Sequence, residues 1–155
     1  VSNDKIKEKI KSFKAVEHRI EYVGSDGVHK FYNDSKSTTT EATIVALKAF
    51  PNKDVTLIMG GRDKMTDLNG LCEKVKESVK NVVLIGEATQ RFKEALLAHG
   101  FDAIYEAKTF EESIDKSIEY KNEIILFSPA CASFDMFDNF EHRGEEFKKY
   151  VGTKI

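Results

Sequence analysis

The sequence predicts an α/β domain of three layers, with a mostly parallel sheet, an N-terminal antiparallel hairpin and helices on both faces. Two observations lead to this prediction. Short apolar runs of strand length alternate along the chain with amphipathic segments of helical length. A turn signal, Ser25-Asp26-Gly27, separates the first two strand-like runs. Alternating strands and helices give a largely parallel sheet, because each helix returns the chain to the end where the next strand begins.

The N-terminal region predicts a helix followed by the hairpin. From Asp4 to Phe13, apolar residues recur on one helical face among lysines and glutamates. His18 to Val23 alternates between polar and apolar residues, and Val28 to Tyr32 alternates again. Two alternating runs joined by a short glycine-containing turn are typical of paired antiparallel strands.

The remaining elements follow from periodicity and from helix signals. Thr38 and Glu41 have the spacing of a capping box, which predicts a helix from Thr38 to about Ala49. Strands are then expected at 55–59, 82–85, 101–105 and 124–127. Helices are expected at 68–79, 87–98, 110–120 and 139–151.

Composition narrows the function classes. The chain has 155 residues, of which 41% are hydrophobic, and this fits one globular domain with its own core. A formal net charge of -2 gives no basic field for nucleic acid. No apolar run approaches the roughly 20 residues that a membrane helix needs. The sequence therefore predicts neither a nucleic-acid partner nor a membrane partner.

The cysteines and histidines predict no metal site. Cys72 and Cys131 lie far apart in the sequence, without the repeated spacing of a disulfide framework or a zinc site. The four histidines show no His-x-x-x-His spacing. Cys131 lies in a turn of small residues, where packing is a better explanation than nucleophilic chemistry.

Three polar loops are expected at the carboxyl edge of the sheet, where open α/β sheets bind ligands. They cover residues 34–40, 60–64 and 128–133. Two interpretations of the first loop stay open. It is either a capped helix start with polar residues in solvent, or an anion or nucleotide site at a helix N-terminus. The chain has neither a Gly-x-x-x-x-Gly-Lys-Ser/Thr phosphate loop nor a Gly-x-Gly-x-x-Gly fingerprint, so it is not expected to hold a nucleoside triphosphate unaided.

One long motif resembles a known family. From Ser128 to Phe147 the chain reads Ser-Pro-Ala-Cys-Ala-Ser-x-Asp-x-Phe-x-x-Phe-x-x-Arg-Gly-x-x-Phe. This run resembles the C-terminal signature of the Mur ligases, in particular of the members that add D-glutamate. Three further segments are similar to motifs of that family: His18 to Glu21, the loop from Asn33 to Thr38, and the turn from Gly60 to Lys64.

The resemblance implies a domain organisation. Mur ligases have a UDP-binding domain, a central ATP-binding domain with the phosphate loop and most magnesium ligands, and a Rossmann-like third domain that closes on the second. The chain resembles only the third domain. Residues 1–15 would be a helical tail of the central domain, and residues 16–155 the C-terminal domain, packed on the central domain of its own chain.

The resemblance also assigns site residues. Two would contact ATP: Arg19 near the phosphates and Asp34 near the ribose. The others would hold the two carboxylates of D-glutamate, which need fixed donors and cations. One carboxylate would meet Lys36, Thr38 and Lys64, and the other would meet Ser133, Phe134 and Phe140, partly through backbone N–H groups. The sequence departs from the family pattern at Ser37, where alanine is usual, and at Thr39, where asparagine is common.

The implied activity belongs to a complete bacterial, cytoplasmic enzyme of peptidoglycan synthesis. That enzyme would join D-glutamate to UDP-N-acetylmuramoyl-L-alanine through an acyl phosphate made with ATP and Mg²⁺, both bound mostly by the central domain. The chain itself would contribute no catalytic residue and would be inactive alone. The alternative is a freestanding α/β module that binds an anionic metabolite and performs no chemistry.

Overall fold

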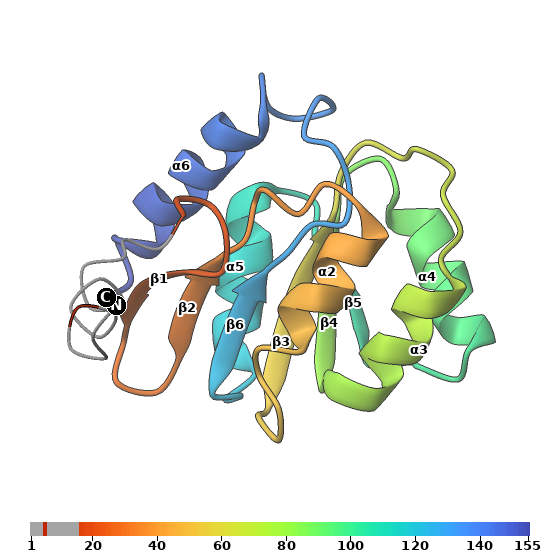
Figure 1. Cartoon of the computed structure of the whole chain (residues 1–155), viewed down its shortest axis with the longest axis horizontal. Helices are drawn as coiled ribbons and strands as arrows, with labels where there is room; N and C mark the ends of the chain where they lie inside the picture. Colours follow the sequence, from red (N-terminus) through yellow and green to blue (C-terminus); the bar gives the residue numbers. More distant parts are fainter. Residues whose placement is uncertain (1–4, 6–15) are drawn as a thin grey trace.

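The computed structural model describes Lys5 and residues 16–155, which form a six-stranded mixed sheet with helices on both faces (Figure 1). The expected helix from Asp4 to Phe13 and the tail of residues 1–15 lie outside the described residues, apart from Lys5. The strands are β1 (Glu21–Ser25), β2 (Lys30–Asn33), β3 (Val55–Gly60), β4 (Asn81–Ile85), β5 (Ile104–Glu106) and β6 (Ile124–Phe127).

The sheet confirms the expected class. The strand order is β1-β2-β6-β3-β4-β5. β1 and β2 pair antiparallel, and every other neighbouring pair is parallel. The helices are α2 (Thr40–Leu47), α3 (Asn69–Ser78), α4 (Thr89–Ala98), α5 (Phe110–Glu119) and α6 (Phe140–Val151). None of these helices is long and apolar enough to cross a membrane.

Side chains alternate along the central strands between two buried clusters. In β3, Leu57 and Met59 join the cluster that also contains residues of α2, α3 and α4. Ile58, between them, joins the second cluster, which contains residues of α5 and α6. All six β3 residues are buried, as expected for a central strand covered on both faces. The sheet is therefore a rigid layer whose carboxyl edge positions the loops that follow it.

The hairpin begins later than the sequence predicts. β1 begins at Glu21 and not at His18, because His18 and Ile20 have left-handed backbone conformations, with φ of 62° and 44°. Such angles are uncommon for residues other than glycine and break an extended run. The segment before β1 is instead a turn.

The start of α2 is also shifted by one residue. The capping box predicted from Thr38 and Glu41 is wrong, because Thr39 is the N-cap. Thr39 has the extended conformation that a cap needs, and its hydroxyl accepts a hydrogen bond of 3.2 Å from the N–H of Ala42. The threonine hydroxyl that the sequence assigned to capping therefore does not cap the helix.

Candidate functional site at the carboxyl edge of the sheet

The loops that follow β2, β3, β4 and β6 gather at the end of the sheet to which these strands point (Figure 1). Backbone hydrogen bonds join them to one another. The N–H of Ala130 donates to the carbonyl of Ser37 at 3.0 Å, and the N–H of Arg62 donates to the carbonyl of Ala132 at 2.9 Å. The three polar loops predicted from the sequence thus form one connected edge.

Asp34 is the buried anchor of the first loop. One carboxylate oxygen accepts from the N–H of Ile20 at 3.1 Å. The other accepts from the hydroxyls of Ser37 at 2.5 Å and Ser128 at 2.7 Å. The side chain has no exposed surface. Burial raises the pKa of Asp34 above its ordinary value, although these hydrogen bonds lower it in part.

The turn after β3 requires glycine at two positions. Gly60 and Gly61 have φ of 124° and 142°, which side-chain-bearing residues rarely adopt. A Cβ on Gly60 would lie 2.0 Å from the carbonyl oxygen of Ile85, and one on Gly61 would lie 2.5 Å from that of Ala132. The turn therefore packs directly against the backbone at the end of β4 and against the loop that follows β6.

The end of this turn is fixed by an ion pair. Arg91 holds Asp63 through two hydrogen bonds, Nε to Oδ2 at 2.7 Å and Nη2 to Oδ1 at 2.9 Å. This pairing lowers the pKa of the Asp63 carboxyl. Lys64, the next residue, is exposed and forms no ion pair with any described residue. Its ammonium group is therefore available to an anion.

The loop after β6 presents unused donors. Ser133 is 2% exposed, and its carbonyl accepts from the N–H groups of Met136 and Phe137 at 3.1 and 2.8 Å. Within the described part of the chain, its hydroxyl has no hydrogen-bond partner. The backbone N–H groups of Ser133, Phe134 and Phe140 also have none there. The structure therefore does not use the Ser133 hydroxyl as a helix cap.

The two aromatic residues assigned to this loop differ in environment. The Phe134 side chain is 65% exposed, and its carbonyl oxygen lies 3.4 Å from a guanidinium nitrogen of Arg62. Phe140 is half-buried at the start of α6, and its carbonyl accepts from the hydroxyl of Ser35 at 2.7 Å. Of these two residues, the backbone N–H groups and the exposed Phe134 ring are thus free to meet a ligand.

Arg143 was not assigned a role from the sequence, although it lies in the long motif. Its side chain is fully buried. Nε donates to the Ser35 hydroxyl at 3.0 Å, Nη2 to the Ser35 carbonyl at 2.7 Å, and Nη1 to the Cys131 carbonyl at 2.9 Å. Burial lowers its pKa to about 10. The available sequence signal was the Arg143-Gly144 pair within the long motif. The burial of Arg143, which is rare for an arginine, is visible only in the structure.

Cys131 is a packing residue, as the sequence suggested. Its side chain is 2% exposed, and burial raises the pKa of the thiol to about 12. A thiol with this pKa stays protonated at neutral pH, whereas nucleophilic attack needs the thiolate.

The remaining predicted residues lie on the surface of the first loop or of the turn before β1. Lys36 is exposed, Thr38 is half-buried, and neither side chain has a partner among the described residues. Arg19 is half-buried, forms no ion pair with the described residues, and lies close enough to lower the pKa of Asp34. The structure thus brings Arg19 and the first loop together and leaves the cations of both unpaired.

One cluster of possible metal ligands lies outside this edge. Glu17, His18 and Glu145 each offer one atom, and these atoms lie within 4.8 Å of one another. The Lys148 ammonium group lies 2.7 Å from Glu17 and 3.0 Å from Glu145, so it already supplies the positive charge. This cluster is therefore already neutralised by a lysine of α6.

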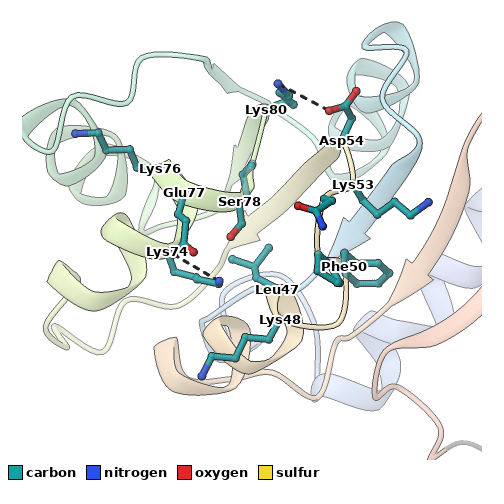
Figure 2. A pocket seen from close by; sticks show the side chains of 13 residues that line it. Leu47, Lys48, Phe50, Lys53, Asp54, Lys74, Lys76, Glu77, Ser78 and Lys80 are labelled. Carbon is teal, nitrogen blue, oxygen red and sulfur yellow. Dashed lines mark ion pairs between the residues drawn. The ribbon is translucent and has the colours of Figure 1, made fainter.

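A pocket of about 540 Å³ lies at the opposite edge of the sheet (Figure 2). The ends of α2 and α3 border it, and Figure 2 shows several lysines around its rim. Lys80 pairs with Asp54 at 3.8 Å, and Lys74 pairs with Glu77 at 3.6 Å. Helix C-termini carry partial negative charge, which opposes anion binding. The pocket also lies away from the amino ends of the helices and carries none of the predicted site residues.

Comparison with known proteins identifies relatives over nearly the whole chain. A family model described as "Mur ligase, glutamate ligase domain" matches residues 18–131. The UDP-N-acetylmuramoylalanine–D-glutamate ligase of Caldicellulosiruptor bescii is 42% identical over 100% of this chain and 34% of its own length. That of Caldanaerobacter subterraneus is 40% identical over 96% of this chain and 34% of its own length. The chain therefore spans about a third of these relatives.

Two solved structures share the fold at low sequence identity. A UDP-N-acetylmuramate–alanine ligase from Thermotoga maritima gives a TM-score of 0.65 at 16% identity, over 96% of this chain and 33% of that chain. A bifunctional folylpolyglutamate synthase/dihydrofolate synthase from Yersinia pestis gives a TM-score of 0.64 at 12% identity, over 97% of this chain and 35% of that chain. At such identities the likeness concerns the fold alone.

Proposed function

The chain belongs to the Mur ligase family through its glutamate ligase domain, and from this we propose that it is the C-terminal domain of an enzyme adding D-glutamate to UDP-N-acetylmuramoyl-L-alanine. The complete ligase would work in the bacterial cytoplasm in peptidoglycan precursor synthesis. It would proceed through an acyl phosphate, for which ATP supplies the phosphoryl group. The central domain would hold Mg²⁺ and most of the ATP, and this domain would pack on it.

The observation that carries the proposal is the set of unused cations and donors at one edge of the sheet. Lys36, Thr38 and Lys64 have no side-chain partner among the described residues. The Ser133 hydroxyl and the N–H groups beside it are also unused there. D-glutamate carries two carboxylates, and fixed cations and N–H donors are the groups that bind them. Holding the substrate this way would orient its amine toward the acyl phosphate.

The nucleotide contacts are proposed for the turn before β1. Arg19 would meet the ATP phosphates, since its guanidinium is partly exposed and has no ion-pair partner among the described residues. Asp34 is proposed to lie near the ribose. Because its carboxylate is buried and holds the N–H of Ile20, its contribution in this domain is to fix the turn that carries Arg19.

The test compares two lysines in the complete ligase. We expect Lys64→Ala to raise the KM for D-glutamate about 10- to 100-fold with little effect on the KM for ATP, because one charge-assisted contact is lost. The matched control is Lys80→Ala, an exposed lysine at the opposite edge. An unchanged D-glutamate KM, or a larger effect on ATP, would refute the assignment of Lys64.

The 155-residue chain alone is proposed to be inactive, since it lacks a phosphate loop. Incubated with ATP, Mg²⁺, D-glutamate and the UDP-linked substrate, the chain should release no phosphate. Turnover by this chain would refute the proposed division of labour between the domains. No observation on the described residues favours the alternative of a freestanding binding module.

A further inference from the structure

A glycine in the middle of α6 has no local justification. Gly144 lies between Arg143 and Glu145 in a helix of 12 residues, and glycine is a poor helix former compared with alanine. Its φ is not in the left-handed region, so the backbone does not demand glycine. The explanation is spatial. A Cβ at this position would lie 2.1 Å from Nδ1 and 2.7 Å from Cε1 of the His18 imidazole.

The imidazole of His18 therefore packs directly against the backbone of α6 at Gly144, and in this sense it is seated on Gly144. The side chain is 6% exposed. Its ring meets the ring of Phe140 edge to face, with centroids 6.2 Å apart. Nδ1 lies 2.9 Å from the Nδ2 amide nitrogen of Asn33. Since that nitrogen is a donor, Nδ1 accepts and Nε2 carries the proton, which points toward Glu145 at 3.6 Å and Glu17 at 3.8 Å.

The backbone around His18 forms a turn that is held from two sides. His18 and Ile20 both have positive φ, so a left-handed residue lies on each side of Arg19 within this turn. The His18 carbonyl accepts from the N–H of Lys36 at 3.0 Å, and the N–H of Ile20 donates to Asp34 at 3.1 Å. Non-glycine residues keep such angles only when the surroundings impose them.

We propose that His18, seated on Gly144, is a positioning residue that holds this turn so that Arg19 faces the nucleotide. The inference rests on the proposed role of Arg19 in ATP binding. In this proposal α6 contacts both sides of the site. Gly144 supports His18, and Arg143 donates a hydrogen bond to the carbonyl of Cys131, in the loop that contains Ser133. The helix thus links the nucleotide side of the site to the amino-acid side.

The experiment fills the space beneath His18 in the complete ligase. We expect Gly144→Ala to raise the KM for ATP about tenfold or more, because the displaced imidazole moves the Arg19 turn and weakens a charge-assisted contact. The KM for D-glutamate should change less than about twofold. The matched control is Gly70→Ala in α3, where a Cβ would meet its nearest atom, in Ile44, at an ordinary 3.6 Å. The control should leave both KM values unchanged.

Two further variants distinguish a positioning role of His18 from a general effect of Gly144→Ala on packing. His18→Ala should raise the KM for ATP by itself. In the double variant with Gly144→Ala the effects should not add, because the clash needs both groups. Additive effects on the KM for ATP would overturn the proposal. So would equal rises in both KM values, or a lowered unfolding temperature with unchanged kinetics.

Arg19→Ala separates the failure of this inference from failure of the proposed function. A raised KM for ATP in Arg19→Ala together with a normal one in Gly144→Ala would overturn the positioning role alone. A normal KM for ATP in Arg19→Ala would refute the nucleotide role of Arg19 and, with it, the inference.

Discussion

Replacing Arg143 with methionine should destabilise the domain by about 4 kcal/mol. The guanidinium donates three hydrogen bonds of 2.7–3.0 Å to Ser35 and Cys131. Without it, two buried carbonyls lose a donor, at about 1–3 kcal/mol each. Methionine keeps part of the apolar volume and limits the cavity. Burial of the charge, which lowers the pKa of Arg143 to about 10, opposes folding and offsets part of this loss.

The measurement is thermal unfolding of the 155-residue chain. For a domain of this size, about 1 kcal/mol corresponds to roughly 2–4 °C, so Arg143→Met should lower the Tm by roughly 8–16 °C. Arg143→Lys should fall between methionine and the native residue, because it keeps the charge and loses the fork of donors. The control is Arg62→Met. Arg62 pairs with Glu87 at 2.8 Å on the surface, where ion pairs contribute less than about 1 kcal/mol.

If Arg143→Met lowers the free energy of unfolding by less than about 1 kcal/mol, the reasoning is refuted. Such a small loss would mean that the cost of burying the charge cancels its three hydrogen bonds, as occurs at some buried ion pairs. Arg143 would then contribute orientation of the two loops without contributing stability. The loops would loosen at nearly constant Tm, and the KM for D-glutamate in the complete ligase would rise.

Two further predictions concern single side chains at the same edge. Ser133→Ala should leave the Tm within roughly 2 °C and raise the KM for D-glutamate in the complete ligase, since the hydroxyl has no partner among the described residues; a lowered Tm with normal kinetics would make Ser133 a structural residue. Asp34→Asn should change the pH dependence of stability. Because burial raises the pKa of Asp34, the folded state binds this proton more tightly than the unfolded chain. The contribution of Asp34 to stability is therefore greatest below its ordinary pKa of about 3.9 and declines as pH rises through the folded value. The stability of native protein relative to Asp34→Asn should fall from acidic to neutral pH, and a constant difference would contradict the prediction.

The sequence predicted the fold class and the relationship to the Mur ligases, and both are confirmed. Strands such as β3 were predictable because a continuous apolar run of strand length is buried on both faces, which places it between two layers of helices. The turn before β1 was not predictable. His18 and Ile20 alternate as strand residues do, and their left-handed angles depend on α6 and Asp34, which are distant in sequence.

The cap of α2 shows why boundaries are harder to predict than elements. Thr38 and Thr39 are adjacent residues of the same type, and only the course of the backbone decides which hydroxyl reaches the free N–H groups. The decision matters for the site. Since Thr39 caps the helix, the Thr38 hydroxyl is left without that role, which is compatible with its proposed contact to a carboxylate.

The polar residues of the carboxyl edge divide into two kinds that sequence alone does not separate. Asp34 and Arg143 are fully buried, and their hydrogen bonds hold the loops together. Lys36 and Lys64 are exposed and, within the described residues, unpaired. Charged residue types occur in both groups, so the distinction arises only from burial. Substrate contacts are therefore expected from the second kind, whereas changes to the first should alter stability and geometry together. A single kinetic effect of Asp34→Asn or Arg143→Met would consequently not identify a direct ligand contact, and the unfolding measurements are needed to separate the two roles.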